Sequence, residues 1–228
     1  MTFKENSAYS FEGLKFTFVL RLDQTASHVE KVIRQQERKL FFRRWLKHPL
    51  QMGTLAPITV RLAESAALLV DNPKGMFVEI GAGTGRLTRS LLRRIENPAN
   101  LAAVELDSFC CGFLQETLPT FLPSDQKLPH IIHGDAVQLP HLLPEPFVGN
   151  VDTVFSVIPL MYLHESTRQA IIDAAFRVLK PGGSILHITY NPKSPLNFMK
   201  HIRQSRQTQL WWNLPPGFVW HYQKIPSV

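Results

Sequence analysis

The sequence is poor in cysteine and contains no long uninterrupted apolar run. Its two cysteines, Cys110 and Cys111, are adjacent. Adjacent cysteines rarely pair with each other, and two thiols cannot complete a zinc site of their own, so neither a disulfide framework nor a metal centre is expected. No segment approaches the ~18 consecutive apolar residues of a membrane-spanning helix, and Lys4, Glu5 and Glu12 interrupt the N-terminus where a signal peptide needs an apolar stretch. We therefore expect a cytoplasmic protein with reduced thiols, which touches a membrane only from its surface.

Acidic residues are scarce relative to basic ones. The 228 residues include 25 Lys and Arg but 18 Asp and Glu, giving a formal net charge of +7 at pH 7 and a pI near 9.6. A basic protein is attracted to polyanions, either nucleic acid or an anionic membrane surface, and charge alone does not choose between them. A hydrophobic content of 44% with 19% charged residues is ordinary for a globular protein, so one α/β domain with an appendage is expected.

Apolar strands alternate with helical segments through most of the chain. The pattern predicts strands at residues 76–80, 101–106, 130–133, 151–157 and 184–190, and helices at 58–70, 87–95, 108–118 and 165–179. Strands and helices that alternate at this spacing form a parallel, doubly wound sheet. Two more strands, at 209–213 and 218–222 around a turn at 214–217, predict an antiparallel pair at the end of that sheet.

A glycine-rich turn follows the first predicted strand of the sheet. Its glycines alternate with other residues, and Arg86 stands where the NAD-binding fingerprint has its third glycine. Glycine lets a ligand approach the backbone closely because no Cβ stands in the way. The stretch Phe77-Val-Glu-Ile-Gly-Ala-Gly-Thr-Gly-Arg86 resembles motif I of class I methyltransferases, which have a Rossmann-like α/β fold with a seven-stranded, mostly parallel sheet. The resemblance implies S-adenosyl-L-methionine as cofactor, held by Glu79, Gly81, Ala82, Gly83 and Gly85.

Acidic residues also follow the next two predicted strands. Glu105 lies 20 positions after Gly85, and an acid at that place can accept hydrogen bonds from both ribose hydroxyls of a nucleotide cofactor. Asp135 follows the third strand and is placed to accept from the adenine amino group. The alternative is that both are solvated loop carboxylates. The remainder of the predicted cofactor set is Glu105, Leu106, Asp135, Ala136 and Ser156.

A strongly basic helical stretch precedes the predicted sheet. Its apolar residues recur at helical spacing, Phe41 with Trp45 and Phe42 with Leu46, and basic residues flank them. Such a helix can lie in a lipid interface, where each cation contributes up to about 1 kcal/mol near an anionic surface. Packing of the aromatic stripe onto the domain, or binding of nucleic acid, are the alternatives. The predicted membrane contacts are Arg38, Lys39, Phe41, Phe42, Arg43, Arg44, Trp45 and Lys47.

These patterns divide the chain into three parts. Residues 1–30 stay uninterpreted, although an apolar stretch at 16–20 has the composition of a short strand. Residues 31–50 are the predicted membrane-binding helix, and 51–228 the predicted methyltransferase domain. The fold expected for the chain is therefore a class I methyltransferase sheet with an antiparallel terminal strand, preceded by N-terminal helices.

The residues after the fourth predicted strand bear on the methyl acceptor. Ribosomal RNA adenine dimethylases have Asn-Leu-Pro-Tyr at this place, where Asn binds the target amine and Tyr stacks on the base. This chain has Val157-Ile-Pro-Leu160 instead, which lacks both groups. The difference argues against an adenine flipped out of nucleic acid and favours an acceptor site with apolar walls.

Several short segments together resemble one family of enzymes. They are residues 176–183, Thr-Tyr-Asn-Pro at 189–192, Ser-Pro at 194–195, Asn-Leu-Pro-Pro at 213–216 and Val-Trp at 219–220, with the aromatic residues of the basic helix. With them, the chain resembles bacterial phospholipid N-methyltransferases. The resemblance implies methylation of phosphatidylethanolamine to its monomethyl form, with phosphatidylcholine as a further product. Ornithine-lipid, RNA or small-molecule methylation, and a non-catalytic lipid-binding protein, are the alternatives.

Three polar side chains near the ends of the fourth and fifth predicted strands are candidates for acceptor chemistry. A primary lipid amine is mostly protonated at neutral pH, so it must lose a proton before it attacks a methyl group. Tyr162, His164 and Tyr190 are predicted to assist, although Tyr190 as a packing residue and His164 as a surface residue at a helix start are alternatives. We expect a monomer at the inner face of the cell membrane, with a phospholipid substrate, no metal and no nucleic-acid partner.

Overall fold

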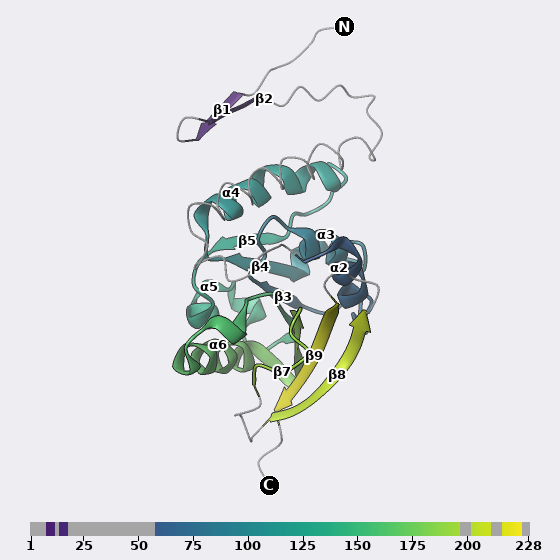
Figure 1. Cartoon of the computed structure of the whole chain (residues 1–228). Coiled ribbons are helices and arrows are strands. Elements are labelled where there is room, and N and C mark those ends of the chain that lie inside the picture. Colours follow the sequence, from purple (N-terminus) through teal and green to yellow (C-terminus); the bar gives the residue numbers. More distant parts are fainter. Residues whose placement is uncertain (1–7, 12–13, 18–57, 197–201, 211–215, 225–228) are drawn as a thin grey trace, which may run out of the picture. The chain divides into compact units, whose positions relative to one another are not determined.

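The computed structural model describes residues 8–11, 14–17, 58–196, 202–210 and 216–224 (Figure 1). The chain divides into two compact units, residues 1–40 and 41–228. In the first unit, β1 (Ala8–Phe11) and β2 (Leu14–Thr17) pair antiparallel, with Ala8 opposite Thr17. The apolar stretch at 16–20 therefore contributes two residues to a strand whose partner comes just before it in the chain. The predicted basic helix lies outside the described residues.

The second unit is built on a seven-stranded sheet with the strand order β5-β4-β3-β6-β7-β9-β8. β5, β4, β3, β6 and β7 run parallel to one another, whereas β9 is antiparallel to both β7 and β8. The predicted fold class is confirmed, with two antiparallel strands at one edge. The strands are β3 (Phe77–Ile80), β4 (Leu101–Glu105), β5 (His130–His133), β6 (Val151–Ser156), β7 (Leu179–Thr189), β8 (Ile202–Leu210) and β9 (Gly217–Lys224).

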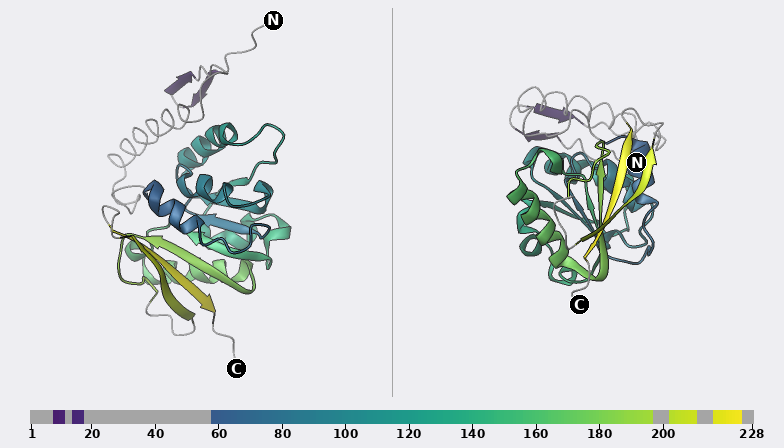
Figure 2. Two further views of the ribbon diagram at one scale, coloured as in Figure 1. Left: turned by 90° about the vertical axis from the view of Figure 1, so that its right-hand side faces the viewer. Right: turned by 60° about the horizontal axis from the view of Figure 1, so that its bottom comes forward.

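Helices cover both faces of this sheet (Figures 1 and 2). The α-helices are α2 (Val60–Ala67), α3 (Arg86–Leu92), α4 (Ser108–Thr117), α5 (Leu139–Leu142) and α6 (Glu165–Val178). The 3₁₀ helices are η1 (Pro98–Asn100), η2 (Leu118–Phe121), η3 (Ala136–Gln138), η4 (Glu145–Phe147) and η5 (Leu160–Tyr162). In the sheet, β3 and β6 are neighbours, although β4 and β5 lie between them in the sequence. The sheet thus changes winding direction between β3 and β6, which is where open α/β sheets bind ligands.

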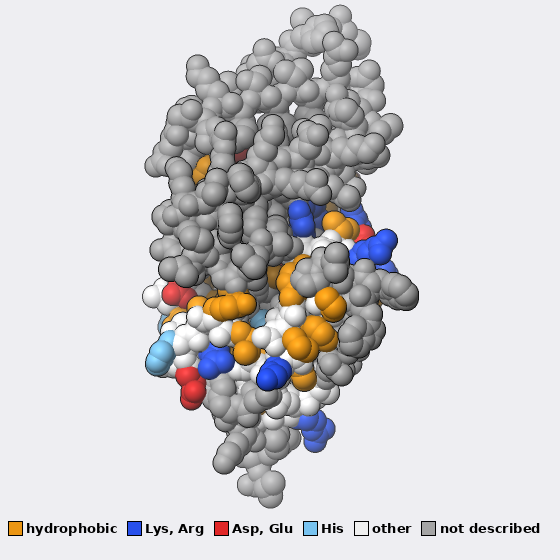
Figure 3. Space-filling model, viewed as in Figure 1, with side chains coloured by type: hydrophobic (Ala, Val, Ile, Leu, Met, Phe, Trp, Pro, Cys, Tyr) orange, Lys and Arg blue, Asp and Glu red, His pale blue; other side chains and the backbone are white. Residues whose placement is uncertain are grey.

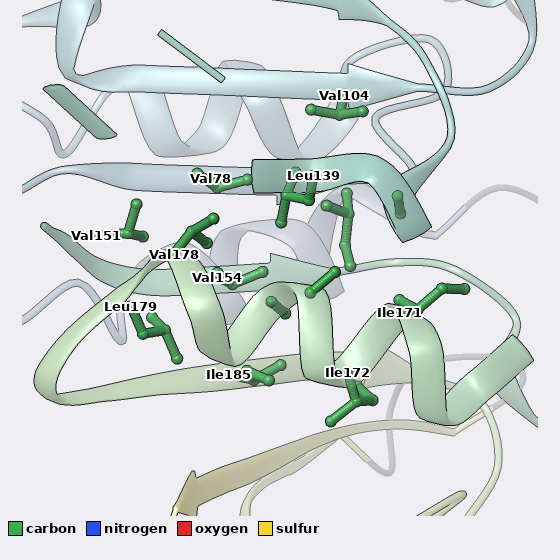
Figure 4. Packing of buried hydrophobic residues seen from close by; sticks show 14 of the residues in the cluster. Val78, Val104, Leu139, Val151, Val154, Ile171, Ile172, Val178, Leu179 and Ile185 are labelled. Carbon is green, nitrogen blue, oxygen red and sulfur yellow. The ribbon is translucent and has the colours of Figure 1, made fainter. Parts of the chain in front are cut away.

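Alternate side chains along each strand point to opposite faces of the sheet and form two apolar layers. On one face, Val78 and Val154 belong to the same apolar cluster as Val178 of α6 (Figure 4). On the other face, the Phe77 and Phe155 rings lie 6.3 Å apart between the sheet and the α2 and α3 helices. Because both faces are covered, the inner strands are apolar on both sides, and polar side chains at their ends are conspicuous.

Two strands begin earlier than the sequence predicts. β7 starts at Leu179, directly after α6, so residues 180–183 end the helix as expected but then continue as strand. Leu179 pairs with Val151 of β6 and Ser184 with Thr153, so residues 180–183 bulge out of this ladder. β8 starts at Ile202 rather than at 209. The sequence did not predict this early start, because residues 203–205 are exposed at the sheet edge and show no apolar alternation.

Candidate functional site

The residues after β3 form a tight loop against the end of β4. The amides of Gly81 and Ala82 both donate to the Val104 carbonyl, at 2.9 and 3.2 Å, and the Gly85 amide donates to the Ala82 carbonyl at 2.9 Å. Gly85 has a φ of +84° at the start of α3, and a Cβ there would lie 2.2 Å from the Leu114 side chain. Only glycine fits this position, because it combines a left-handed backbone with close packing against α4.

Glu105, the last residue of β4, holds this loop in place. Its Oε2 accepts a hydrogen bond from the Gly83 amide at 2.7 Å, and its Oε1 accepts from the Asp107 amide at 2.9 Å. Burial raises the pKa of Glu105, and the hydrogen bond from the Gly83 amide opposes that shift. A Cβ on Gly83 would meet no atom within 4 Å, so a ligand can approach the loop there. Each carboxylate oxygen can still accept a further hydrogen bond, which leaves the group able to receive hydroxyl donors.

Glu79 lies on β3, on the face that α3 covers, and its side chain is completely buried. Its Oε2 accepts a hydrogen bond from the Thr88 hydroxyl at 2.6 Å. Within the described part of the chain, its Oε1 has no hydrogen-bond partner. Desolvation raises the pKa of Glu79 to about 8, so the carboxyl group carries a proton at neutral pH. A buried oxygen without a partner costs about 1–3 kcal/mol.

The predicted adenine-side residues lie at the ends of β4 and β5. Asp135 is exposed, and its carboxylate accepts from the Val137 amide at 3.0 Å, so it caps η3. Ala136 beside it is buried, whereas the Leu106 side chain is 66% exposed. The Leu106 carbonyl lies 3.0 Å from Nε2 of His133. The structure thus gives Asp135 a local capping role, and a contact with adenine stays a prediction.

A buried polar pair at the ends of β6 and β7 was not predicted as a unit. Ser156 Oγ lies 3.2 Å from Nδ1 of His187, and both side chains are almost fully buried. Burial lowers the pKa of His187 to about 4, so the ring is neutral at physiological pH. The two residues face each other across adjacent strands, and Ser156 also pairs with Ile80 at the end of β3. The sequence does contain a signal for this pair, because His187 stands within an otherwise apolar strand. The sequence does not show that Ser156 is the partner of that histidine.

The three predicted acceptor-side residues have different surroundings. Tyr190 is half-buried, and its hydroxyl oxygen accepts a hydrogen bond from the Thr59 amide at 2.9 Å. Tyr162 is 78% exposed in η5. His164 is exposed and caps α6, with Nδ1 2.8 Å from the Ser166 hydroxyl. No contact described in the structure joins the three, so their roles in catalysis stay predictions.

The exit of β6 is apolar and lies against the glycine loop. A Cβ on Gly81 would come within 3.1 Å of the Ile158 side chain, which is partly buried. Beyond it, Met161 is 36% exposed. On the face shown in Figure 3, hydrophobic side chains of the described residues gather beside several Lys and Arg side chains. The wall next to the loop is therefore apolar at Ile158.

Two further properties concern the described residues alone. None of their helices has the length and apolar character needed to cross a bilayer. They also contain no group of three or more His, Cys, Asp or Glu side chains arranged to hold a metal ion. The residues predicted to contact a membrane, from Arg38 to Lys47, lie outside the described residues.

A sequence model of a methyltransferase domain matches residues 77–183, from β3 into β7. The structure also superposes on the O-methyltransferase from Bacillus cereus in complex with S-adenosylhomocysteine, with a TM-score of 0.62. That likeness covers 90% of this chain and 93% of the other at 13% identity, so it concerns the fold alone. The matched residues of the sequence model include the glycine loop and Glu105.

Three characterised relatives are similar in sequence. An ornithine lipid N-methyltransferase of Singulisphaera acidiphila is 24% identical over 67% of this chain and 78% of its own length. A malonyl-[acyl-carrier protein] O-methyltransferase of Haemophilus ducreyi is 30% identical over 80% of this chain and 66% of its own. The ribosomal RNA small subunit methyltransferase A of a Synechococcus species is 34% identical, over 50% of this chain and 36% of its own length. The relatives share methyl transfer but act on different acceptors.

Proposed function

We propose that this chain, an S-adenosylmethionine-dependent methyltransferase with the class I fold, methylates the amine of phosphatidylethanolamine. The observation that carries the proposal is the apolar exit of β6 beside the glycine loop, where Ile158 contacts the position of Gly81. An acceptor bound there has apolar chain to bury and needs no hydrogen bonds from that wall. The similarity to an ornithine lipid N-methyltransferase supports a lipid amine as the acceptor class.

The cofactor carries an activated methyl group on its sulfonium, and the chain's own residues would bind and orient it. In this proposal Glu105 accepts the ribose hydroxyls, and the open backbone at Gly83 lets the methionine portion lie against the loop. The buried Glu79 supports the loop from below through its hydrogen bond with Thr88. Leu106 offers an exposed apolar surface beside Asp135 for the adenine. The proposed cofactor contacts are Glu79, Gly81, Ala82, Gly83, Gly85, Glu105, Leu106, Asp135, Ala136 and Ser156.

The acceptor amine must approach in its neutral form. An apolar site disfavours the ammonium ion and so assists its loss of a proton, and alignment of the nitrogen with the methyl group then supplies proximity. Tyr190, Tyr162 and His164 are the proposed polar groups near the amine. Tyr190 is the first to test, because the Thr59 amide holds its hydroxyl in position.

The proposed membrane anchor is the basic helix at 31–50. Replacing Arg43, Arg44 and Lys47 with Glu should abolish binding to anionic vesicles, because three favourable charges become repulsive. Affinity for S-adenosylhomocysteine in solution should stay unchanged. The measurement is co-sedimentation with phosphatidylglycerol-containing vesicles.

The matched control replaces three exposed basic residues of the domain, Arg61, Arg94 and Lys127, with Glu. It makes the same change in net charge away from the helix and should retain vesicle binding. Equal loss in both variants would show that net charge, not the helix, drives binding.

The acceptor is identified by incubating the protein with radiolabelled cofactor and vesicles, and then separating the lipids. We expect label in monomethyl-phosphatidylethanolamine when the vesicles contain phosphatidylethanolamine, and none when phosphatidylcholine replaces it. Label only in ornithine lipid would change the acceptor but keep the lipid class. Label only in added RNA would overturn the lipid proposal and favour the activity of the ribosomal RNA relative.

A further inference from the structure

Two hydrogen bonds hold the residues that lead into α2. Nη1 of Arg86 donates to the Ile58 carbonyl at 2.9 Å. The Thr59 amide donates to the Tyr190 hydroxyl, also at 2.9 Å. We call Ile58 and Thr59 the α2 lead-in. Each of its two residues is therefore held through its backbone by a side chain from a different part of the domain.

The two side chains come from the segments that border the candidate site. Arg86 is the first residue of α3 and directly follows Gly85, the last glycine of the loop. Tyr190 directly follows β7, the strand that carries His187. Arg86 is also the residue that replaces the third glycine of the NAD fingerprint. Its side chain does not obstruct the loop but reaches out to α2.

Packing makes the lead-in a defined element rather than a loose connection. Ile58 is 8% exposed and packs in the same apolar cluster as Leu62 and Leu87. Thr59 caps α2, with its side chain accepting from the Leu62 amide at 3.2 Å and its carbonyl from the Ala63 amide at 3.0 Å. Movement of the lead-in would thus disturb both the cap of α2 and the packing against α3.

A second connection between α2 and α3 is weak by comparison. Nη1 of Arg93 lies 3.9 Å from Glu64 Oε1, and both side chains are about half exposed. An exposed ion pair at that distance contributes little. The bonds from Arg86 and Tyr190 are shorter and reach the backbone of the lead-in itself, so we take them as polar contacts that fix where the lead-in sits relative to the loop.

We propose that Arg86 and Tyr190 are positioning residues that link cofactor binding at the glycine loop to the seating of the α2 lead-in. A ligand that orders residues 81–85 also fixes Arg86, which then holds Ile58 more firmly. By linkage, a seated lead-in strengthens ligand binding by the same factor. The lead-in follows the residues proposed to bind a membrane, so under the proposed function the same link would join membrane contact to the cofactor site.

The test uses the full chain with S-adenosylhomocysteine and needs neither lipid nor acceptor. Hydrogen exchange at the Leu62 and Ala63 amides reports whether the lead-in is seated, because Thr59 accepts from both. We expect the ligand to slow exchange at these amides in the wild type. Arg86→Gln and Tyr190→Phe should speed it and weaken ligand affinity about 5-fold or more. Arg86→Lys, which keeps a donor, should restore part of the affinity.

Two controls separate linkage from general damage. Arg94→Gln changes an exposed arginine just beyond α3, and Tyr222→Phe removes a buried hydroxyl that contacts Ser194 at 2.9 Å. Both should leave exchange at Leu62 and Ala63 and ligand affinity unchanged, even where Tyr222→Phe lowers Tm. The proposal is overturned if the variants speed exchange without weakening affinity, or if the ligand leaves exchange unaltered in the wild type. Neither result bears on which acceptor is methylated.

Discussion

Glu105→Ala is expected to weaken binding of S-adenosylhomocysteine by about 1–3 kcal/mol, a loss of about 5- to 150-fold in affinity. The carboxylate holds the Gly83 and Asp107 amides, and we propose that it also receives the ribose hydroxyls. Its removal leaves a disordered loop and two unmatched donors. Isothermal titration measures the affinity, and Glu116→Ala, an exposed acid on α4, is the matched control.

A double-mutant cycle separates the ribose contact from the ordering of the loop. Adenosine and 2′,3′-dideoxyadenosine differ only in the hydroxyls, so their ratio of affinities isolates that contact. The wild type should prefer adenosine, and Glu105→Ala should lose most of the preference. An unchanged preference in the variant would assign Glu105 to the loop alone. Because burial raises the pKa of Glu105, the preference should also fade as pH falls through that raised value, where the carboxylate takes up a proton.

The stability of the domain is expected to fall as pH rises from about 6.5 to about 8, because of Glu79; between about pH 4.5 and 6.5 the buried neutral His187 contributes a slope of the opposite sign. In the unfolded chain its carboxyl has the ordinary pKa of 4.5, whereas the folded protein retains the proton up to about pH 8. Between these values the folded state binds more protons than the unfolded one, so the free energy of unfolding decreases with pH, by at most about 1.4 kcal/mol per unit. Above about pH 8 this contribution to the slope ends.

Urea unfolding at several pH values between 5 and 9 measures this slope. Glu79→Gln keeps the size of the side chain but cannot ionise, so it should lose most of the fall above about pH 6.5 and be the more stable protein at the alkaline end. Glu116→Gln changes an exposed acid and should retain the wild-type slope. Glu105 contributes in the same direction, so a residual slope in Glu79→Gln is expected. A full wild-type slope in Glu79→Gln would show that Glu79 is ionised in the folded state.

Most of the fold could be predicted because the signals that define it are local. The strand at 130–133 and the start of α6 at 165 match the predicted residues, since apolar periodicity and turn residues mark them. The early starts of β7 and β8 could not be predicted in the same way. Residues 203–205 pair with β9 because a neighbouring strand is present, whereas 180–183 bulge between two pairs with β6. The composition of neither segment favours a strand.

The site was predictable in part for the same reason. Glycines at a turn after a strand predict that a ligand approaches the backbone closely. An acid at the end of the next strand predicts that it lies at the same edge of the sheet as that turn. The sequence does not reveal that Glu105 also binds the Gly83 amide, or that Asp135 caps η3. These contacts depend on how the loop folds back, which the spacing of residues leaves open.

The sequence by itself determined the order of the elements, the glycine loop and the acidic residue that faces it, because each depends on neighbours in the chain. Only the tertiary structure decided which distant residues meet. Ser156 and His187 are 31 residues apart, and Tyr190 and Thr59 are 131 apart. Their contacts follow from strand order and helix packing. Burial, which also arises only on folding, sets the proton on Glu79 and the neutral state of His187.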